Sequence, residues 1–77
     1  MKKALVIGAA GFVGSYLIDC LHDEFGYEVY ATKLPGTEFT HDKAEVYDLD
    51  ILKKEDIAEL LYKILPDCIF HLAAQSS

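Results

Sequence analysis

Residues 8–14 read GAAGFVG, and this stretch decides the fold because it joins a buried strand to an amphipathic helix. Its glycines recur at every third position, as G-x-x-G-x-x-G. In such a turn Gly8 allows a sharp bend off the strand, and Gly11 lets the backbone approach a diphosphate with no side chain in between. Gly14 lets the helix pack tightly on the sheet. A helix that begins there directs unpaired amide groups and the positive end of its dipole at a bound anion.

The position of this turn, after a strand and at the start of a helix, is the context in which a glycine-rich motif binds a dinucleotide. The sequence therefore predicts a dinucleotide site at residues 8–14. The alternative is a tight packing turn that binds no ligand. A P-loop for nucleoside triphosphates is excluded, because the glycines are not followed by Gly-Lys-Ser or Gly-Lys-Thr.

The residues around the turn show the hydrophobic periodicities of alternating strands and helices. The aliphatic run at residues 3–8 predicts a strand that is buried on both faces. Residues 11–25 predict a helix whose apolar face comprises Phe12, Val13, Tyr16, Leu17, Cys20 and Leu21. The later patterns predict strands at 27–32, 44–49 and 68–73, a surface loop at 34–42, and a second helix at 53–65.

The predicted order, β-α-β-β-α-β, is that of the amino-terminal half of a doubly wound Rossmann fold, an α/β fold with a mainly parallel sheet. Residues 68–73 are apolar almost throughout, so we expect this strand to be buried on both sides. In that setting His71 is expected to be packed and hydrogen-bonded, although its titration range also allows a catalytic role.

Composition argues against several classes of function. The 77 residues fit one small domain at most, and 52% hydrophobic with 26% charged residues is typical of a packed core. The net charge of −6 repels nucleic acid and anionic bilayers, and no apolar run approaches the ~20 residues of a membrane span. The spacing of Cys20 and Cys68 fits neither a disulfide nor a zinc site, so we expect both cysteines to be small buried apolar residues. We also expect no metal site and a cytoplasmic location.

The spacing of the glycine turn resembles that of the extended short-chain dehydrogenase/reductase family, of the NAD-dependent epimerase/dehydratase type. Three other stretches agree with this resemblance. Residues 47–52, YDLDIL, resemble the aspartate-aliphatic element that binds adenine, and residues 66–70, PDCIF, resemble the stretch that leads into the fourth strand. Residues 71–77, HLAAQSS, are similar to the segment that passes beside the cofactor. Their QSS ending is most similar to the GDP-sugar branch, the GDP-4-keto-6-deoxymannose reductases and GDP-mannose 4,6-dehydratases.

The resemblance covers nearly all of residues 1–77 but only about the first quarter of a typical member, so it implies a partial NAD(P)-binding Rossmann domain. It implies that the pyrophosphate is contacted by Gly8, Ala10, Gly11, Phe12, Val13 and Gly14. It also implies that the wall beside the adenosine ribose and the nicotinamide is formed by Leu72, Ala73 and Ala74.

Two aspartates are candidates for the adenine contact that the resemblance implies. The usual helix length, counted back from Pro66, favours Asp50, with Ile51 contributing its backbone. Asp48 is the alternative. Either carboxylate could instead cap a helix or be a solvated loop charge.

The residue that selects the cofactor is expected about twenty residues beyond the glycine turn, where enzymes that use NAD carry an acidic side chain for the ribose hydroxyls. That place falls at Thr32 and Lys33, and neither is a carboxylate. Lys33 could neutralise a 2′-phosphate through charge-assisted hydrogen bonds. The sequence therefore predicts NADP(H) in preference to NAD(H). The alternative is that Lys33 is only a solvated loop lysine.

The family implies hydride transfer at a sugar carbon, with a catalytic tyrosine and lysine in a Tyr-x-x-x-Lys arrangement. No such arrangement occurs in residues 1–77, so we expect no catalytic residue among them. We interpret the chain as the amino-terminal fragment of an NADP(H)-dependent sugar-nucleotide oxidoreductase. The alternatives are a non-catalytic nucleotide-binding module and a fragment that folds but binds nothing. The apolar strand at 68–73 would be an exposed sheet edge in such a fragment, which predicts self-association.

Overall fold

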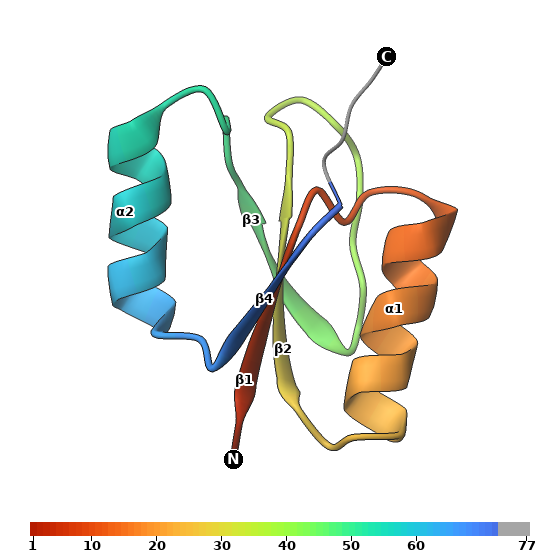
Figure 1. The fold of residues 1–77 in the computed structure, drawn as a ribbon. Helices are drawn as coiled ribbons and strands as arrows, with labels where there is room; N and C mark the ends of the chain where they lie inside the picture. The colour runs from red at the N-terminus through yellow and green to blue at the C-terminus, as the bar shows by residue number, and fades with distance from the viewer. Residues whose placement is uncertain (73–77) are drawn as a thin grey trace.

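A computed structural model describes residues 1–72 of the chain. These residues form parallel strands with a helix on either side (Figure 1). The elements follow the order β1 (Lys3–Ile7), α1 (Phe12–Asp23), β2 (Glu28–Lys33), β3 (Ala44–Asp48), α2 (Lys54–Ile64) and β4 (Cys68–His71). Within the described residues the strands form one sheet of order β3-β2-β1-β4, with every neighbouring pair parallel. This arrangement confirms the predicted α/β fold and the order β-α-β-β-α-β.

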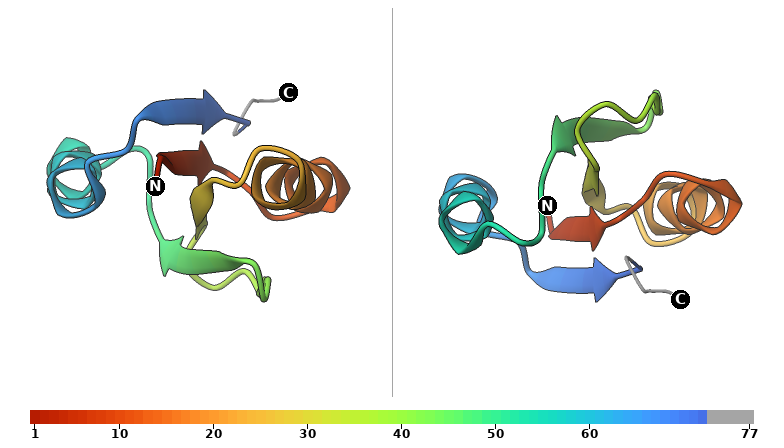
Figure 2. Two further views of the ribbon diagram at one scale, coloured as in Figure 1. Left: turned by 90° about the horizontal axis from the view of Figure 1, so that it is seen from below. Right: turned by 90° about the horizontal axis from the view of Figure 1, so that it is seen from above.

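The two helices lie on opposite faces of the sheet (Figure 2). Helix α1 connects β1 to β2, and α2 connects β3 to β4. Strand β1 lies inside the sheet between β2 and β4, and its residues Ala4, Leu5 and Val6 are completely buried. The unbroken aliphatic run therefore corresponds to a strand covered on both faces, as predicted. Neither helix within residues 1–72 has the length and apolarity needed to cross a bilayer.

Successive side chains of β1 point to opposite faces of the sheet, so the interior consists of two hydrophobic cores. Ala4 and Val6 face α1, where they pack with Ile18 and Leu21; we name this group the α1-side core. Leu5 and Ile7 face the other way, and the α2-side core also includes Leu49, Leu60 and Ile64. The layers are therefore held together by side chains of a single strand that point in opposite directions.

The buried face of α1 matches the predicted one only in part: Leu21 is buried and Leu17 packs against the α1-side core, but the first turns differ. Phe12 is 88% exposed, and Val13 and Tyr16 are each 65% exposed. The buried residues are Gly14, Ile18 and Leu21, whose spacing also defines one helix face. The prediction considered only large apolar side chains. The helix instead turns Gly14 toward the sheet, because a residue without a side chain permits the closest approach.

The prediction that β4 is buried on both sides was wrong, because the strand order places β4 at the edge of the sheet. Cys68 and Phe70 pack against the α1-side core, but Ile69 is 49% exposed and His71 is also exposed. The expected packed environment of His71 is therefore absent. Cys20 and Cys68 are free and half-buried.

The α2-side core predicts a large stability difference between two leucines. Leu5→Ala removes a completely buried side chain and should lower the free energy of unfolding by about 2–5 kcal/mol, or unfold the chain outright. Leu52→Ala, at a side chain that is 86% exposed, should change it by less than about 0.5 kcal/mol. Urea denaturation followed by circular dichroism measures both, and equal losses would contradict the core described here.

Candidate dinucleotide-binding site

The candidate site lies at the carboxyl edge of the sheet, where all the strands of residues 1–72 end because they are parallel. The glycine turn leaves β1 at this edge and leads into the amino end of α1 (Figure 1). The ends of β2 and β3 follow on one side of β1, and the end of β4 follows on the other. In open α/β sheets this edge is the usual place for a ligand.

The backbone of the glycine turn has the conformation that its sequence predicts. Gly8 and Gly11 have φ angles of 77° and 117°, which residues other than glycine rarely adopt. At Gly14 the constraint is a contact: an added Cβ atom would lie 1.7 Å from the carbonyl oxygen of Ala9. Gly14 must therefore remain a glycine for α1 to lie this close to the turn.

Thr32, at the end of β2, holds the start of the turn. Its hydroxyl accepts a hydrogen bond from the amide of Gly8 at 3.0 Å, and its carbonyl accepts one from the amide of Ala9 at 2.8 Å. The side chain of Thr32 is almost completely buried. Sequence reasoning missed this role, although a hydroxyl residue in a buried strand is a signal that could have suggested it. Gly8 consequently shapes the turn, and its own amide is already occupied.

The first amides of α1 have no backbone acceptor in the part of the chain that the structure describes. Among the described residues, the first amide of this helix that reaches a backbone acceptor is that of Ser15, which donates to the Gly11 carbonyl at 3.2 Å. Phe12, Val13 and Gly14 precede it, and Gly11, the N-cap, supplies no side-chain hydrogen bond. Such amides, together with the helix dipole, attract an anion. The geometry therefore suits a phosphate group beside residues 12–14.

Lys33 and Asp48 lie side by side at the ends of β2 and β3, where they are register partners. The ammonium of Lys33 donates a hydrogen bond to the carboxylate of Asp48 and forms an ion pair with it. A hollow of about 500 Å³ adjoins Lys33 and is lined further by Thr37, Glu38, Phe39 and Thr40. The predicted cofactor-selecting lysine is thus at the expected edge, but its charge is already paired.

Asp50, the favoured adenine candidate, lies beyond the end of β3 in a local turn. Its carboxylate accepts a hydrogen bond from the amide of Leu52 at 3.0 Å, and its carbonyl accepts one from the amide of Lys53. Ile51 is half-buried and packs against the α2-side core. The structure therefore places Asp48, the alternative candidate, next to Lys33. The Asp50 carboxylate instead stabilises its own turn by accepting the hydrogen bond from Leu52.

The predicted wall of the site begins at Leu72. Its amide donates to the carbonyl of Ile7 at 2.8 Å, so the chain passes beside the start of the glycine turn after leaving β4. Ala73 and Ala74, the other two residues predicted for this wall, lie outside the described residues.

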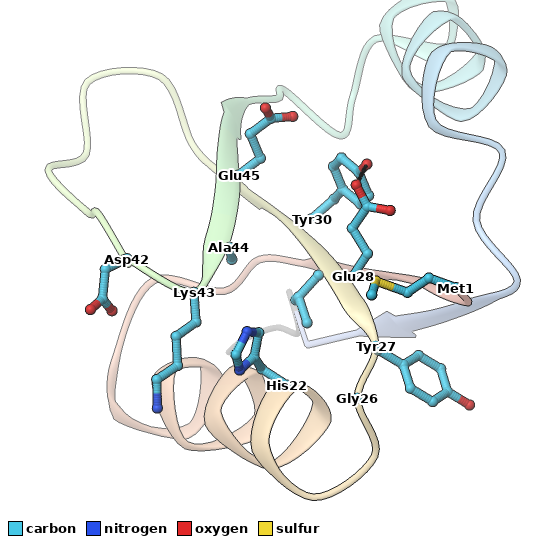
Figure 3. A pocket seen from close by; sticks show the side chains of 11 residues that line it. Met1, His22, Gly26, Tyr27, Glu28, Tyr30, Asp42, Lys43, Ala44 and Glu45 are labelled. Atoms are coloured by element: carbon cyan, nitrogen blue, oxygen red, sulfur yellow. Dashed lines mark hydrogen bonds between the residues drawn. The ribbon is translucent and has the colours of Figure 1, made fainter.

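A second hollow, of about 560 Å³, lies at the opposite, amino edge of the sheet (Figure 3). The hydroxyl of Tyr30 donates to the Glu28 carboxylate at 2.6 Å, and this hydrogen bond raises the pKa of Tyr30 to about 12. Lys43 donates to Asp23 at 2.7 Å and holds the pKa of Asp23 below its usual value. The hollow is lined by none of the predicted cofactor residues, so the carboxyl edge remains the candidate site.

Comparison with known proteins agrees with this geometry. Residues 4–77 match the model of the NAD dependent epimerase/dehydratase family. The chain is 41% identical over 83 residues to a UDP-glucose 4-epimerase of Mycolicibacterium smegmatis, in an alignment that covers 97% of the chain and 26% of that relative. It is 30% identical over 90 residues to a GDP-mannose 4,6-dehydratase of Yersinia enterocolitica, covering 99% of the chain and 24% of the relative.

Solved structures show the same segment. An L-threonine dehydrogenase from Clostridium difficile superposes with a TM-score of 0.81 at 34% identity, over 100% of the chain and 25% of that structure. A UDP-glucose 4-epimerase from Brucella ovis, solved in complex with NAD, superposes with a TM-score of 0.78 at 27% identity, over 100% of the chain and 24% of that structure.

The chain spans about a quarter of the length of the curated relatives it matches. The family model nevertheless extends over nearly all of the chain, including the glycine turn and every described strand and helix except the first residue of β1. The chain therefore belongs to the NAD dependent epimerase/dehydratase family.

Proposed function

We propose that this chain is the dinucleotide-binding segment of an NAD(P)-dependent enzyme that acts on nucleotide sugars. The observation that carries the proposal is the amino end of α1, where the amides of Phe12, Val13 and Gly14 precede the first amide that has a backbone acceptor within residues 1–72. Thr32 fixes the turn that leads into it, so the amides need little reorganisation to receive a diphosphate.

The sugar-nucleotide part of the proposal rests on the relatives. A UDP-glucose 4-epimerase and a GDP-mannose 4,6-dehydratase are among them, which supports a nucleotide-sugar substrate for the longer protein. The resemblance of the QSS ending favours a GDP-sugar reductase of the GDP-4-keto-6-deoxymannose type. The likeness to an L-threonine dehydrogenase supports a second candidate, oxidation of an amino-acid alcohol, with the same segment binding the cofactor.

The part that residues 1–77 play in such an enzyme is to bind and orient the cofactor. The cofactor would supply or accept the hydride, and the turn and α1 would hold its diphosphate. The Tyr-x-x-x-Lys pair that the family implies is absent from these residues, so we assign them no catalytic residue. A stand-alone nucleotide-binding module would use the same contacts without turnover. A cytoplasmic location is part of the proposal and rests on the composition.

Titration of the chain with NADPH, followed by amide chemical shifts, tests the proposed function. The amides of Phe12, Val13 and Gly14 should move most, because they are expected to donate to the diphosphate. Lys43 and Glu45, at the amino-edge hollow, should move little. No shifts at any residue would contradict dinucleotide binding, and shifts confined to the amino edge would place the ligand elsewhere.

The proposal includes a preference for NADP(H), which rests on Lys33 at the end of β2. Hydrogen bonds to charged groups are worth about 1.5–3 kcal/mol, so Lys33→Glu should lower the ratio of NADPH to NADH affinity by about 10-fold to 100-fold. Lys2→Glu makes the same charge change at the amino edge, before β1, and should leave that ratio nearly constant. Calorimetric titration measures both ratios, and an unchanged ratio in Lys33→Glu would defeat the NADP(H) assignment.

We also propose that the chain self-associates through the edge of β4. This strand carries no Asp, Glu, Lys or Arg, whereas the opposite edge strand, β3, carries Glu45 and Asp48. Charged side chains on an edge strand oppose pairing with another sheet, and β4 lacks that protection. The exposed side chain of Ile69 adds apolar surface to the same edge.

Sedimentation velocity over a range of concentrations should show a dimer or larger species of the unaltered chain. Ile69→Lys should shift the distribution toward the monomer, because it places a charge on the exposed edge. Tyr62→Lys, on a side chain of α2 that is 83% exposed, is the matched control and should not. A chain that stays monomeric at high concentration, or equal effects of the two variants, would count against the β4 interface.

A further inference from the structure

We propose that Asp48 weakens the preference for NADP(H) by holding the ammonium of Lys33, so that the Lys33–Asp48 pair sets how well the site distinguishes the two cofactors. The inference rests on the proposed function, since it assumes that the adenosine ribose lies at the ends of β2 and β3. Its basis is the ion pair between the two side chains.

Strand register places both groups on the side of the sheet that α1 covers. Lys33 and Asp48 are register partners, and so are Ala31 and Val46, two positions earlier on the same strands. Ala31 is buried in the α1-side core and Val46 packs against it. Because alternate residues of a strand face the same side, Lys33 and Asp48 also face the α1 side. The amino end of α1, which is the proposed diphosphate site, lies on that side as well.

The two partners differ in how far they reach solvent. The side chain of Lys33 is 18% exposed, whereas that of Asp48 is 58% exposed. A ligand that approaches from solvent therefore meets the carboxylate at least as readily as the sheltered ammonium. Lys33 would attract a phosphate, whereas the more exposed carboxylate of Asp48 would repel it.

The charges of the two cofactors then determine the selectivity. The 2′-phosphate of NADP(H) carries about −1.5 to −2 charges at neutral pH, so the Asp48 carboxylate repels it while neutralising Lys33. The 2′-hydroxyl of NAD(H) carries no charge and can donate a hydrogen bond to a carboxylate. The pair as a whole is neutral, so it attracts the 2′-phosphate less than an unpaired lysine would. A lysine at this position consequently gives a smaller preference for NADP(H) than its charge alone implies.

The test is the ratio of NADPH to NADH affinity of the 77-residue chain, measured by calorimetry at one ionic strength. Asp48→Asn should raise this ratio about tenfold, because it frees the charge of Lys33. Asp48→Ser provides a second neutral side chain at the same position and should raise the ratio similarly. Glu45→Gln removes one negative charge from the other end of β3 and should change the ratio less than about twofold.

The same substitution in a Lys33→Met background shows whether Asp48 acts through the lysine. There Asp48→Asn should raise the ratio clearly less than it does beside Lys33, because only the direct repulsion between the carboxylate and the 2′-phosphate is relieved and no ammonium remains to be freed. An unchanged ratio in both Asp48 variants, or an equal rise with and without Lys33, would overturn the inference while dinucleotide binding persists. A chain that is folded by circular dichroism but binds neither cofactor would instead refute the proposed function, and the inference with it.

Discussion

The contact between Gly14 and the carbonyl oxygen of Ala9 is the constraint on which the rest of the site depends. An added Cβ at Gly14 would lie 1.7 Å from that oxygen, so only a glycine allows α1 to approach the turn this closely. The approach brings Ile18 and Leu21 onto the sheet, and it leaves Phe12 and Val13 at the surface. It also places the amino end of the helix beside the glycine turn, at the carboxyl edge of the sheet. A packing requirement in the core thereby determines where an anion can bind.

Thr32 couples this turn to the strand that carries the cofactor-selecting position. Its hydroxyl and carbonyl hold the amides of Gly8 and Ala9, and Lys33 is the next residue along β2. The proposed diphosphate site and the proposed ribose site are therefore joined through the hydrogen bonds of Thr32. Asp48 joins it from β3, since it pairs with Lys33 in register and through an ion pair. The residues proposed to bind the cofactor and those proposed to select it therefore lie side by side, at the carboxyl ends of β1, β2 and β3.

Hydrophobic periodicity was sufficient to predict the order of the elements, because buried strands and amphipathic helices have different repeats. The apolar pattern of β4 indicated that this strand is buried on both sides, whereas the interpretation as a fragment predicted an exposed sheet edge. The structure has the edge, and the environment predicted for His71 was wrong for that reason. The apolar face of α1 was misplaced in part, because a hydrophobic pattern gives no weight to Gly14.

The sequence was sufficient to place the glycine turn and Lys33 at the carboxyl edge, whereas the pairing of Lys33 with Asp48 needed the register of β2 and β3. The most direct measurement of the central claim is a crystal structure of the chain with a bound nicotinamide dinucleotide. Diphosphate oxygens should lie within about 2.7–3.2 Å of amide nitrogens among residues 12–14. A cofactor bound at the amino edge, or amides of these residues that point to protein groups, would contradict the account.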